Sequence, residues 1–281
     1  MQTAPNRNRI RIVQSRQNSR VKELRAALSR SGRSADEFVA LEGLHLVAEA
    51  LRSGLRIATV FVRQGSESLL DPLSLSAETE ILALPSDVFD SAVTTESPQG
   101  LAALAIPLHC NLEDLFCRVP LVVVTAGLQD PGNMGTLLRS AEAFGATGII
   151  ALPGTVSHWN PKALRASSGS AFRLPVFTLG PEEAIAGLRQ HHLRLLATTV
   201  TGGTSLQTVD LSQPCALLVG NEGSGLPPWL LAEADERITI RCDGPVESLN
   251  AAVAASVLLY EASRQRNLLS ASRAAQRVTS L

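Results

Sequence analysis

The stretch LVVVTAGLQDPGNMGTLLRSAEAFGATGIIAL (residues 121–152) sets the fold class of this chain. Its first seven residues are almost all small or aliphatic, as in a buried strand. Turn-forming residues follow at 130–132, and apolar positions then recur at helical spacing as far as Phe144. Gly145 ends this helix, and a second aliphatic run covers residues 147–152. A strand, a helix and a second strand of this kind predict a parallel βαβ unit.

The same alternation continues to the C-terminus. Short aliphatic runs that alternate with helical patterns are typical of a mostly parallel sheet with helices on both faces. We therefore predict an α/β fold for the second half of the chain. The expected strands are residues 174–179, 193–200, 215–219 and 236–241, and the expected helices are 161–172, 182–192, 227–234 and 248–266.

The first half reads as a smaller α/β unit. Val21, Leu24 and Leu28 share one face of a predicted helix, and a second helix ends at Gly54. Ser86 is expected to cap a short third helix. Predicted strands cover 38–42, 57–62, 80–85 and 100–107. The predicted organisation is a basic arm at 1–20, a first domain at 21–107, a linker near 107–118 and a second domain at 118–270.

Composition limits the function classes. The chain has 281 residues, of which 45% are hydrophobic and 18% charged, as in ordinary globular proteins. No apolar run approaches the ~20 residues that cross a bilayer, and no apolar signal core follows the basic N-terminus. We therefore expect a cytoplasmic protein that makes no use of a membrane. The four cysteines form no C-x-x-C pair, so neither a metal site nor a disulfide framework is expected.

Positive charge is concentrated at the two ends of a chain whose net charge is −1. Residues 1–33 hold nine cations against Glu23 alone, a net of +8, and four arginines follow the last acidic residue, Glu261. These charges indicate either a phosphate-contacting arm or a solvated tail. The cations are Arg7, Arg9, Arg11, Arg16, Arg20, Lys22, Arg25, Arg30 and Arg33, then Arg264, Arg266, Arg273 and Arg277.

Three polar loops follow predicted strands, at 127–135, 220–227 and 242–250. Ligands of parallel sheets bind beyond the carboxyl ends of the strands, so we expect these loops to converge on one site. In the first loop, Asn133 either caps the helix that starts near Gly135 or serves a ligand. Arg139 either pairs with Glu142 or holds a phosphate or a developing oxyanion.

The second loop, GNEGSG, contains Gly220, Gly223 and Gly225, which allow tight turns and close approach to a ligand. It matches neither the Walker pattern nor the dinucleotide pattern. Glu222 would repel a bound phosphate, so a neutral or cationic ligand is expected.

The third loop places Glu247, Ser248 and Asn250 at the mouth of an apolar helix. Ser248 alone would be read as its N-cap. The run from Ala251 to Tyr260 is apolar or small except at Ser256, which favours a subunit interface.

Together the three loops resemble the motifs of the SpoU–TrmH family of RNA ribose 2′-O-methyltransferases, in the SPOUT superfamily. The motifs are N-x-G-x-x-x-R-x-A-x-x-F-G (Asn133 to Gly145), G-N-E-G-x-G-L (Gly220 to Leu226) and E-S-L-N (Glu247 to Asn250). The resemblance covers the whole second half. The stretch LEGLHLVAEAL (41–51) is also similar to the ribosomal-protein-like RNA-binding domain that precedes the catalytic domain in many members.

The resemblance implies a deep trefoil knot, a homodimer, and S-adenosylmethionine held bent between the loops around Gly220 and Leu249. In place of the Pro-Met and Val-Ser of many members, this chain has Arg241-Cys242 and Ala251-Ala252. The first departure concerns a wall of the cofactor pocket. By position, the implied catalytic residues are Asn133, Arg139, Glu222, Ser248 and Asn250, and the implied cofactor-binding residues are Gly220, Asn221, Glu222, Gly223, Ile240, Leu249 and Asn250.

The implied activity is methyl transfer to a ribose 2′-hydroxyl of structured RNA, with ribosomal RNA favoured over transfer RNA. An arginine guanidinium keeps its proton in proteins, so we interpret Arg139 as a stabiliser of the nascent alkoxide and not as a base. Three alternatives stay open. They are a transfer-RNA ribose methyltransferase, a SPOUT enzyme that methylates a base nitrogen, and a non-catalytic RNA-binding protein that kept the fold.

Overall fold

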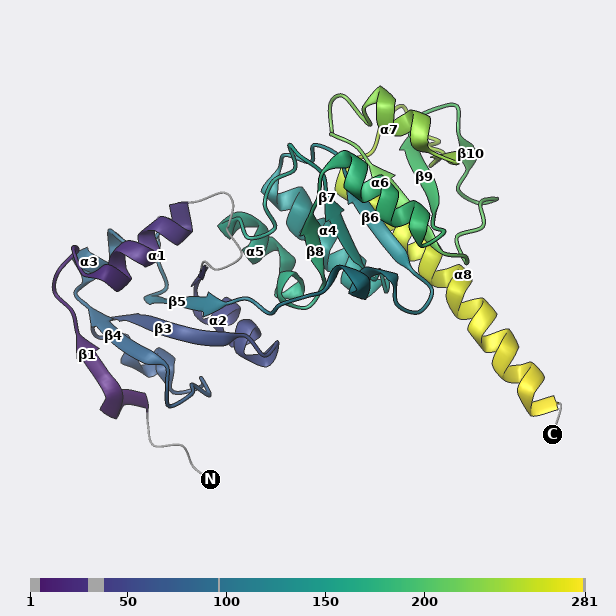
Figure 1. Ribbon diagram of the computed structural model, residues 1–281. Coiled ribbons are helices and arrows are strands. Elements are labelled where there is room, and N and C mark those ends of the chain that lie inside the picture. The colour runs from purple at the N-terminus through teal and green to yellow at the C-terminus, as the bar shows by residue number, and fades with distance from the viewer. Residues whose placement is uncertain (1–5, 30–37, 96, 280–281) are drawn as a thin grey trace. The chain divides into compact units, whose positions relative to one another are not determined.

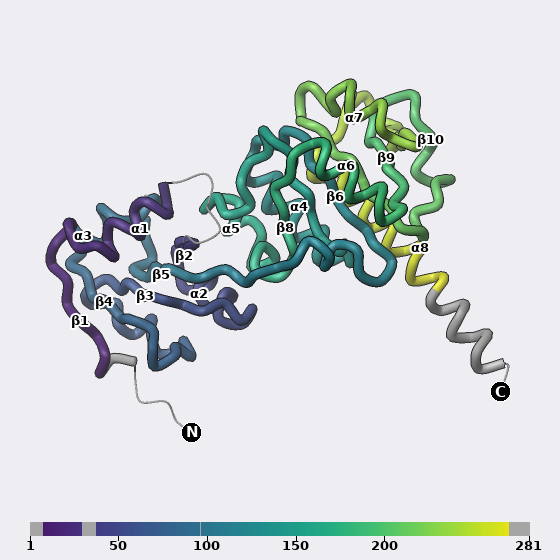
Figure 2. The backbone as a smooth tube through the Cα atoms, viewed as in Figure 1, coloured from purple at the N-terminus to yellow at the C-terminus, as the bar shows by residue number. Residues whose placement is uncertain are grey.

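The computed structural model describes residues 6–29, 38–95 and 97–279, with side chains from residue 8 to residue 269 within these ranges. The chain divides into two compact units, drawn as ribbons in Figure 1 and as a tube in Figure 2. The first unit comprises residues 1–109 together with 157–173, and the second comprises 110–156 together with 174–281. The sequence did not indicate that residues 157–173 belong to the first unit.

The first unit is built on a five-stranded sheet with the order β1-β4-β3-β5-β2. Strand β5 runs antiparallel to β3 and β2, whereas β1, β4 and β3 are parallel, so this sheet is mixed. Its strands are β1 (Ile10–Ile12), β2 (Val39–Glu42), β3 (Arg56–Arg63), β4 (Glu80–Leu84) and β5 (Leu101–Ile106).

Helices cover this sheet much as the apolar spacing predicts. Helix α1 (Ser19–Ser29) buries Val21, Leu24 and Leu28, and α2 (Leu44–Arg52) ends before Gly54, which has a φ of 82°. The prediction that Ser86 caps α3 (Ser86–Asp90) is wrong, because Pro85 holds the cap position and Ser86 already lies in the helix. The short 3-10 turns of this unit are η1 (Asn6–Arg9), η2 (Glu67–Leu70) and η4 (Ser170–Phe172).

Part of the basic arm predicted at residues 1–20 is held by the first unit. Strand β1 pairs with β4, and the arginines around it bind groups of the same unit. A guanidinium that already has internal partners is less able to follow a phosphate backbone. The contacts are Arg9 to the carbonyls of Ser76 (3.0 Å) and Ala77 (2.7 Å), Arg11 to Glu80 (2.9 Å), Arg16 to Asp87 (2.9 Å) and Arg20 to Glu23 (2.8 Å). Residues 1–5, Arg30 and Arg33 lie outside the described residues.

Helix α5 (Pro161–Ser167) is shorter than the helix predicted at 161–172. Ser168 and Gly169 have φ values of 51° and 91°, a conformation that no α-helix continues. The segment 157–173 lies against the first unit, with α5 beside the edge strand β2. At its end, Arg173 Nη1 donates to Glu49 Oε2 (3.2 Å) and Ser53 Oγ (2.9 Å).

The second unit confirms the predicted parallel sheet. Seven parallel strands lie in the order β10-β12-β9-β11-β6-β7-β8. The two-residue strand β10 was not predicted. The strands are β6 (Leu121–Thr125), β7 (Gly148–Ala151), β8 (Val176–Thr178), β9 (Arg194–Thr199), β10 (Thr204–Ser205), β11 (Cys215–Val219) and β12 (Glu236–Thr239).

Helices lie on both faces of this sheet (Figure 1). Helices α6 (Pro181–Gln190) and α7 (Pro228–Glu233) contribute Leu188 and Leu230 to the buried cluster on one face. Helices α4 (Pro131–Ala143) and α8 (Ala251–Thr279) pack together and contribute nothing to that cluster, so they belong to the other face. Among the described residues, no helix is both long and apolar enough to cross a membrane.

The predicted linker contains structure. The 3-10 turn η3 (Leu112–Phe116) begins at a reciprocal capping box between Asn111 and Asp114, and Leu115 is fully buried in the core of the second unit. The second unit therefore begins at Cys110.

The arginines near the C-terminus are also engaged by the protein. Arg264 pairs with Glu261 at 2.7 Å on the surface of α8. Arg266 turns inward and donates to the carbonyls of Val119 (2.8 Å), Pro120 (3.0 Å), Leu211 (3.0 Å) and Gln213 (2.9 Å). Arg266 is therefore not part of a solvated tail, whereas Arg264 lies on the surface. The side chains of Arg273 and Arg277 lie outside the description.

Candidate functional site

Helix α4 begins earlier than predicted, and this releases Asn133 for other contacts. Asp130 is the N-cap residue and accepts a hydrogen bond from the Asn133 backbone N–H at 2.9 Å, with Pro131 in the first turn. The interpretation of Asn133 as the cap is therefore wrong. Its side chain instead projects from the first turn of α4.

The amide of Asn133 joins the three predicted loops. Asn133 Nδ2 donates to Glu222 Oε1 at 2.7 Å, and Asn133 Oδ1 accepts from Asn250 Nδ2 at 3.0 Å. The loops after β6, β11 and β12 thus meet through three side chains at the carboxyl edge of the sheet, as the topology predicts. We refer to Asn133, Glu222 and Asn250 as the amide–carboxylate triad.

Asn250 has a second role as the N-cap of α8. Its Oδ1 accepts from the backbone N–H groups of Ala252 (2.9 Å) and Val253 (3.2 Å). Ser248 is therefore not the cap, contrary to the reading of that residue alone. Ser248 and Glu247 are exposed just before the helix.

The glycine loop after β11 is folded by its own groups. A Cβ on Gly220 would lie 2.2 Å from the Gly225 carbonyl carbon, so only glycine fits there. Asn221 pairs with Gly225 through both backbone groups, and its Oδ1 accepts from the N–H groups of Gly223 (2.9 Å) and Ser224 (3.1 Å). These bonds present the exposed Glu222 toward α4.

Asn221 also ties the glycine loop to the first loop. Its Nδ2 donates to the Gly127 carbonyl at 2.7 Å, so every polar atom of this amide is used inside the protein. Asn221 therefore holds the glycine loop and the first loop together. Gly223 lies in the exposed part of the loop.

Arg139 is exposed on α4, six residues beyond Asn133. It forms no hydrogen bond or ion pair with any residue that the structure describes, so the predicted pairing with Glu142 is not observed. Its guanidinium thus retains all five donors for another molecule.

The loop after β12 offers backbone groups to a ligand. Ile240 and Leu249 are half-buried, residues 241–248 are exposed, and no backbone–backbone hydrogen bond of the described chain involves the N–H of residues 240–249. Arg241 pairs with Asp243 at 2.9 Å, and Cys242 is exposed.

One loop of this edge, the loop after the predicted strand β9, was not among the three loops predicted to form the site. Strand β9 lies between β11 and β12, so the loop that follows it opens between the glycine loop and the 240–249 loop. Val200 in that loop is 58% exposed, and Val246 across the edge is 57% exposed. Exposed aliphatic side chains beside unused backbone groups are typical of a small-molecule site. The sequence of this loop, TTVTGG (residues 198–203), indicates a site only when the order of the strands in the sheet is known.

Comparisons with known proteins agree on one family. The profile of the SpoU rRNA Methylase family matches residues 120–260, and that of the MRM3-like substrate binding domain matches residues 18–103. The 23S rRNA (guanosine(2553)-2′-O)-methyltransferase RlmP of Bacillus subtilis is 31% identical over 249 residues, which cover 88% of this chain and 97% of the relative.

Solved structures give the same result. An AdoMet-bound rRNA methyltransferase from Sinorhizobium meliloti matches with a TM-score of 0.79 at 30% identity, covering 91% of this chain and 98% of that one. The SpoU methyltransferase AviRb from Streptomyces viridochromogenes, in complex with AdoMet, matches with a TM-score of 0.77 at 28% identity, covering 89% and 98%. The family indicated by the three sequence motifs is confirmed: the chain belongs to the SpoU rRNA methylase family.

Proposed function

We propose that this protein transfers a methyl group from S-adenosylmethionine to a ribose 2′-hydroxyl of ribosomal RNA. The observation that carries the proposal is the amide–carboxylate triad, which joins the three family motifs at one edge of the sheet. Arg139 follows on the same helix and has no partner among the described residues. The relatives named as rRNA methyltransferases support ribosomal over transfer RNA as substrate. A ribosomal RNA substrate in turn supports a cytoplasmic protein.

The loops at the carboxyl edge fit the proposed cofactor. An adenosine needs hydrogen-bonding groups along its base and apolar contact on its faces. The unused backbone groups of residues 240–249 and of Gly220 suit the first need, and Val200, Val246 and Leu249 suit the second. When bound, S-adenosylmethionine supplies an electrophilic methyl group.

The protein's own residues then position and activate the ribose. Glu222 and the amides of Asn133 and Asn250 orient hydroxyl groups by hydrogen bonds, which holds the attacking oxygen in line. Arg139 stabilises the charge that develops on that oxygen and anchors the adjacent phosphate. Ser248, exposed beside the triad, contributes a further hydroxyl to RNA. We assign the released proton to water, because Arg139 cannot act as a base and the site is open to solvent.

The test is methylation of unmodified 23S rRNA with radiolabelled S-adenosylmethionine, followed by alkaline hydrolysis. A ribose 2′-O-methyl group blocks cleavage at its nucleotide, so a label that resists hydrolysis in a dinucleotide supports the proposal. A label released as a methylated mononucleotide would indicate base methylation instead. Cofactor binding without any labelled RNA would indicate a non-catalytic protein, and transfer RNA as the better acceptor would overturn the substrate assignment.

Asn250→Asp should separate the two roles of Asn250. Aspartate caps a helix as well as asparagine does, so thermal stability is expected to stay unchanged. The variant loses the Nδ2 donor to Asn133 and brings a second carboxylate near Glu222, so methyl transfer should fall roughly tenfold or more, equivalent to ~1.4 kcal/mol. Asn250→Ala, as a comparison, should lose both stability and rate. If Asn250→Asp transfers methyl groups at the wild-type rate, the amide–carboxylate triad has no role in the reaction.

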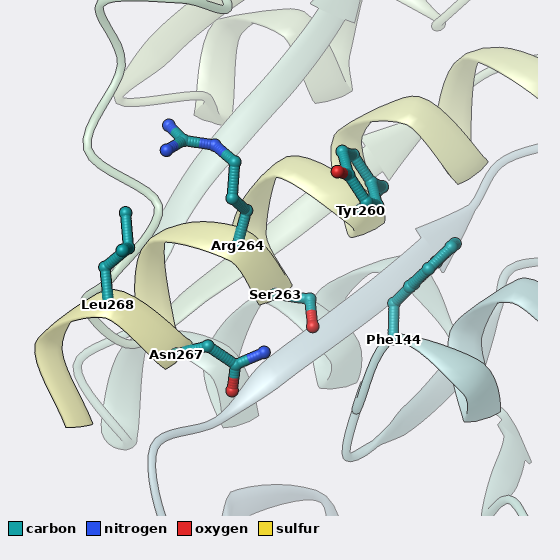
Figure 3. Close-up of a pocket in the computed structure, with 6 residues that line it drawn as sticks. All are labelled: Phe144, Tyr260, Ser263, Arg264, Asn267 and Leu268. Atoms are coloured by element: carbon teal, nitrogen blue, oxygen red, sulfur yellow. The ribbon is translucent and has the colours of Figure 1, made fainter. Parts of the chain in front are cut away.

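We also propose a homodimer. On α8, Val253 (47% exposed), Val257 (37%), Tyr260 (56%) and Leu268 (56%) follow one another at helical spacing on an exposed face. Tyr260 meets Phe144 edge-on at 5.6 Å beside an open pocket of about 390 Å³, whose lining Figure 3 shows. This row of exposed apolar side chains, interrupted by Arg264, supports a protein interface on α8.

Sedimentation should therefore detect a dimer at micromolar concentration, and Tyr260→Glu should dissociate it by burying a charge in the interface. Thr136→Glu places the same charge on an exposed position of α4 outside the apolar row and serves as control. A mass of 29.8 kDa for the wild-type protein at that concentration would reject the dimer.

A further inference from the structure

The described arginines near the N-terminus, Arg9, Arg11 and Arg16, have partners within the first unit. The segment 157–173 is a second source of positive charge in that unit. It contains Lys162, Arg165 and Arg173, and no acidic residue occurs between Glu142 and Glu182. A cationic segment free of carboxylates is suited to a polyanion.

Two of these cations lie together on the outer side of α5. Lys162 and Arg165 are both exposed and are three residues apart, which makes them neighbours on the helix surface. Ala163, Leu164 and Ser167 are buried on the opposite side. The side chain of Arg165 forms no hydrogen bond or ion pair with any described residue.

One carboxylate of this neighbourhood, Glu49, is already neutralised. Glu49 pairs with Arg52 at 2.6 Å and with Arg173 at 3.2 Å, and its side chain is only 16% exposed. It therefore offers little repulsion to a phosphate near α5. Arg173 itself is used in fixing the segment.

An aromatic side chain precedes the two cations. Trp159 comes directly before Asn160, the N-cap of α5, and remains partly exposed. Its ring lies 6.4 Å from the buried Phe172 at an interplanar angle of 25°, and 4.5 Å from His158. This support holds the indole in place, which lowers the entropic cost of stacking another ring on it.

We propose that Trp159, Lys162 and Arg165, together the α5 surface, bind a single-stranded loop of the RNA substrate. Trp159 stacks on an unpaired base, and the two cations contact phosphates on either side of it. A combination of aromatic stacking and cationic groups is the usual means of binding single-stranded nucleic acid. The inference rests on the proposed function for the identity of its ligand as RNA.

The first test is the salt dependence of RNA binding by the full-length protein. The probe is a fluorescein-labelled RNA hairpin with a single-stranded loop. Lys162→Ala/Arg165→Ala should weaken binding about tenfold at low salt and reduce the slope of log affinity against log salt by roughly 1.5, since each phosphate contact contributes ~0.7–0.9. Affinity for S-adenosylmethionine and thermal stability should stay unchanged.

The matched control removes two cations from another part of the same unit. Lys22 is exposed on α1, and Arg16 precedes that helix in an exposed pair with Asp87. Arg16→Ala/Lys22→Ala should bind the hairpin nearly as the wild type does. Two results would overturn the proposal that the α5 surface binds RNA. One is an equal loss of RNA affinity in both double variants, and the other is a wild-type salt slope in Lys162→Ala/Arg165→Ala.

The second test addresses stacking. Trp159→Leu should lose roughly 5–150-fold in affinity for the looped hairpin, in line with ~1–3 kcal/mol per stacked base, whereas Trp159→Phe should retain most of it. A fully paired RNA of the same length should bind all three proteins alike. If Trp159→Leu loses as much affinity for the paired RNA as for the looped hairpin, Trp159 does not stack on an unpaired base.

These tests stand apart from the test of methylation. A wild-type protein that binds the hairpin through the α5 surface yet methylates no ribosomal RNA would refute only the proposed activity. If variants of Trp159, Lys162 and Arg165 bind and methylate ribosomal RNA as the wild type does, only the RNA-binding role of the α5 surface is refuted.

Discussion

Arg139→Ala is expected to lower the rate of methyl transfer by roughly 10²–10³-fold, as loss of one donor to a developing oxyanion typically does. The guanidinium is exposed and has no protein partner among the described residues, so its removal disturbs no internal contact. Affinity for S-adenosylmethionine should survive, because Arg139 lies on α4 and outside the glycine loop and the 240–249 loop.

Single-turnover methylation under saturating RNA, together with calorimetric titration of the cofactor, measures both quantities. Thr136→Ala alters another exposed position of α4 and should retain full activity. Arg139→Lys keeps the charge but loses the planar fork, so an intermediate rate is expected. Half of the wild-type rate in Arg139→Ala would show that the assigned role is wrong.

Arg266→Met is expected to cause the largest loss of stability. The guanidinium donates to four backbone carbonyls that precede β6 and β11, and its burial lowers the pKa of Arg266. Methionine matches the stem but leaves these carbonyls without their donors. Bonds to a charged group contribute ~1.5–3 kcal/mol each when removed singly, and such losses do not add, so we expect about 3 kcal/mol in total.

The measurement is thermal unfolding. About 3 kcal/mol corresponds to a fall of roughly 6–12 °C in Tm for a unit of this size. Arg264→Met makes the same substitution two residues earlier on α8, where Arg264 pairs with Glu261 in water, and its Tm should equal that of the wild type. Equal Tm values in the two variants would mean that the Arg266 contacts are not stabilising.

Local patterns predicted the strands and helices well, because aliphatic runs and helical spacing report burial directly. Val21, Leu24 and Leu28 are buried as their spacing indicates, and the second unit has the predicted parallel sheet. The motifs likewise brought Asn133, Glu222 and Asn250 to one edge. The trefoil knot and the homodimer stay predictions from the resemblance.

Other features depend on contacts between distant residues, which local patterns do not encode. The charge of Arg9, Arg11 and Arg16 is visible in the sequence, but the carbonyls and carboxylates that engage it are about seventy residues away. The caps were misplaced for a different reason. Asp130, Asn133, Ser248 and Asn250 are all good capping residues, and only tertiary contacts decide which one serves.

Because residues 157–173 belong to the first unit, the substrate-binding unit is not coded by one continuous stretch of sequence. A substrate-recognition module coded as one continuous block could be gained, lost or swapped by a single recombination event. Here a cut near residue 109 would remove α5 from its place beside β2 and leave that strand with an uncovered edge, a template for aggregation. The two units are therefore bound to evolve together, and a chimaera with another methyltransferase needs two junctions instead of one.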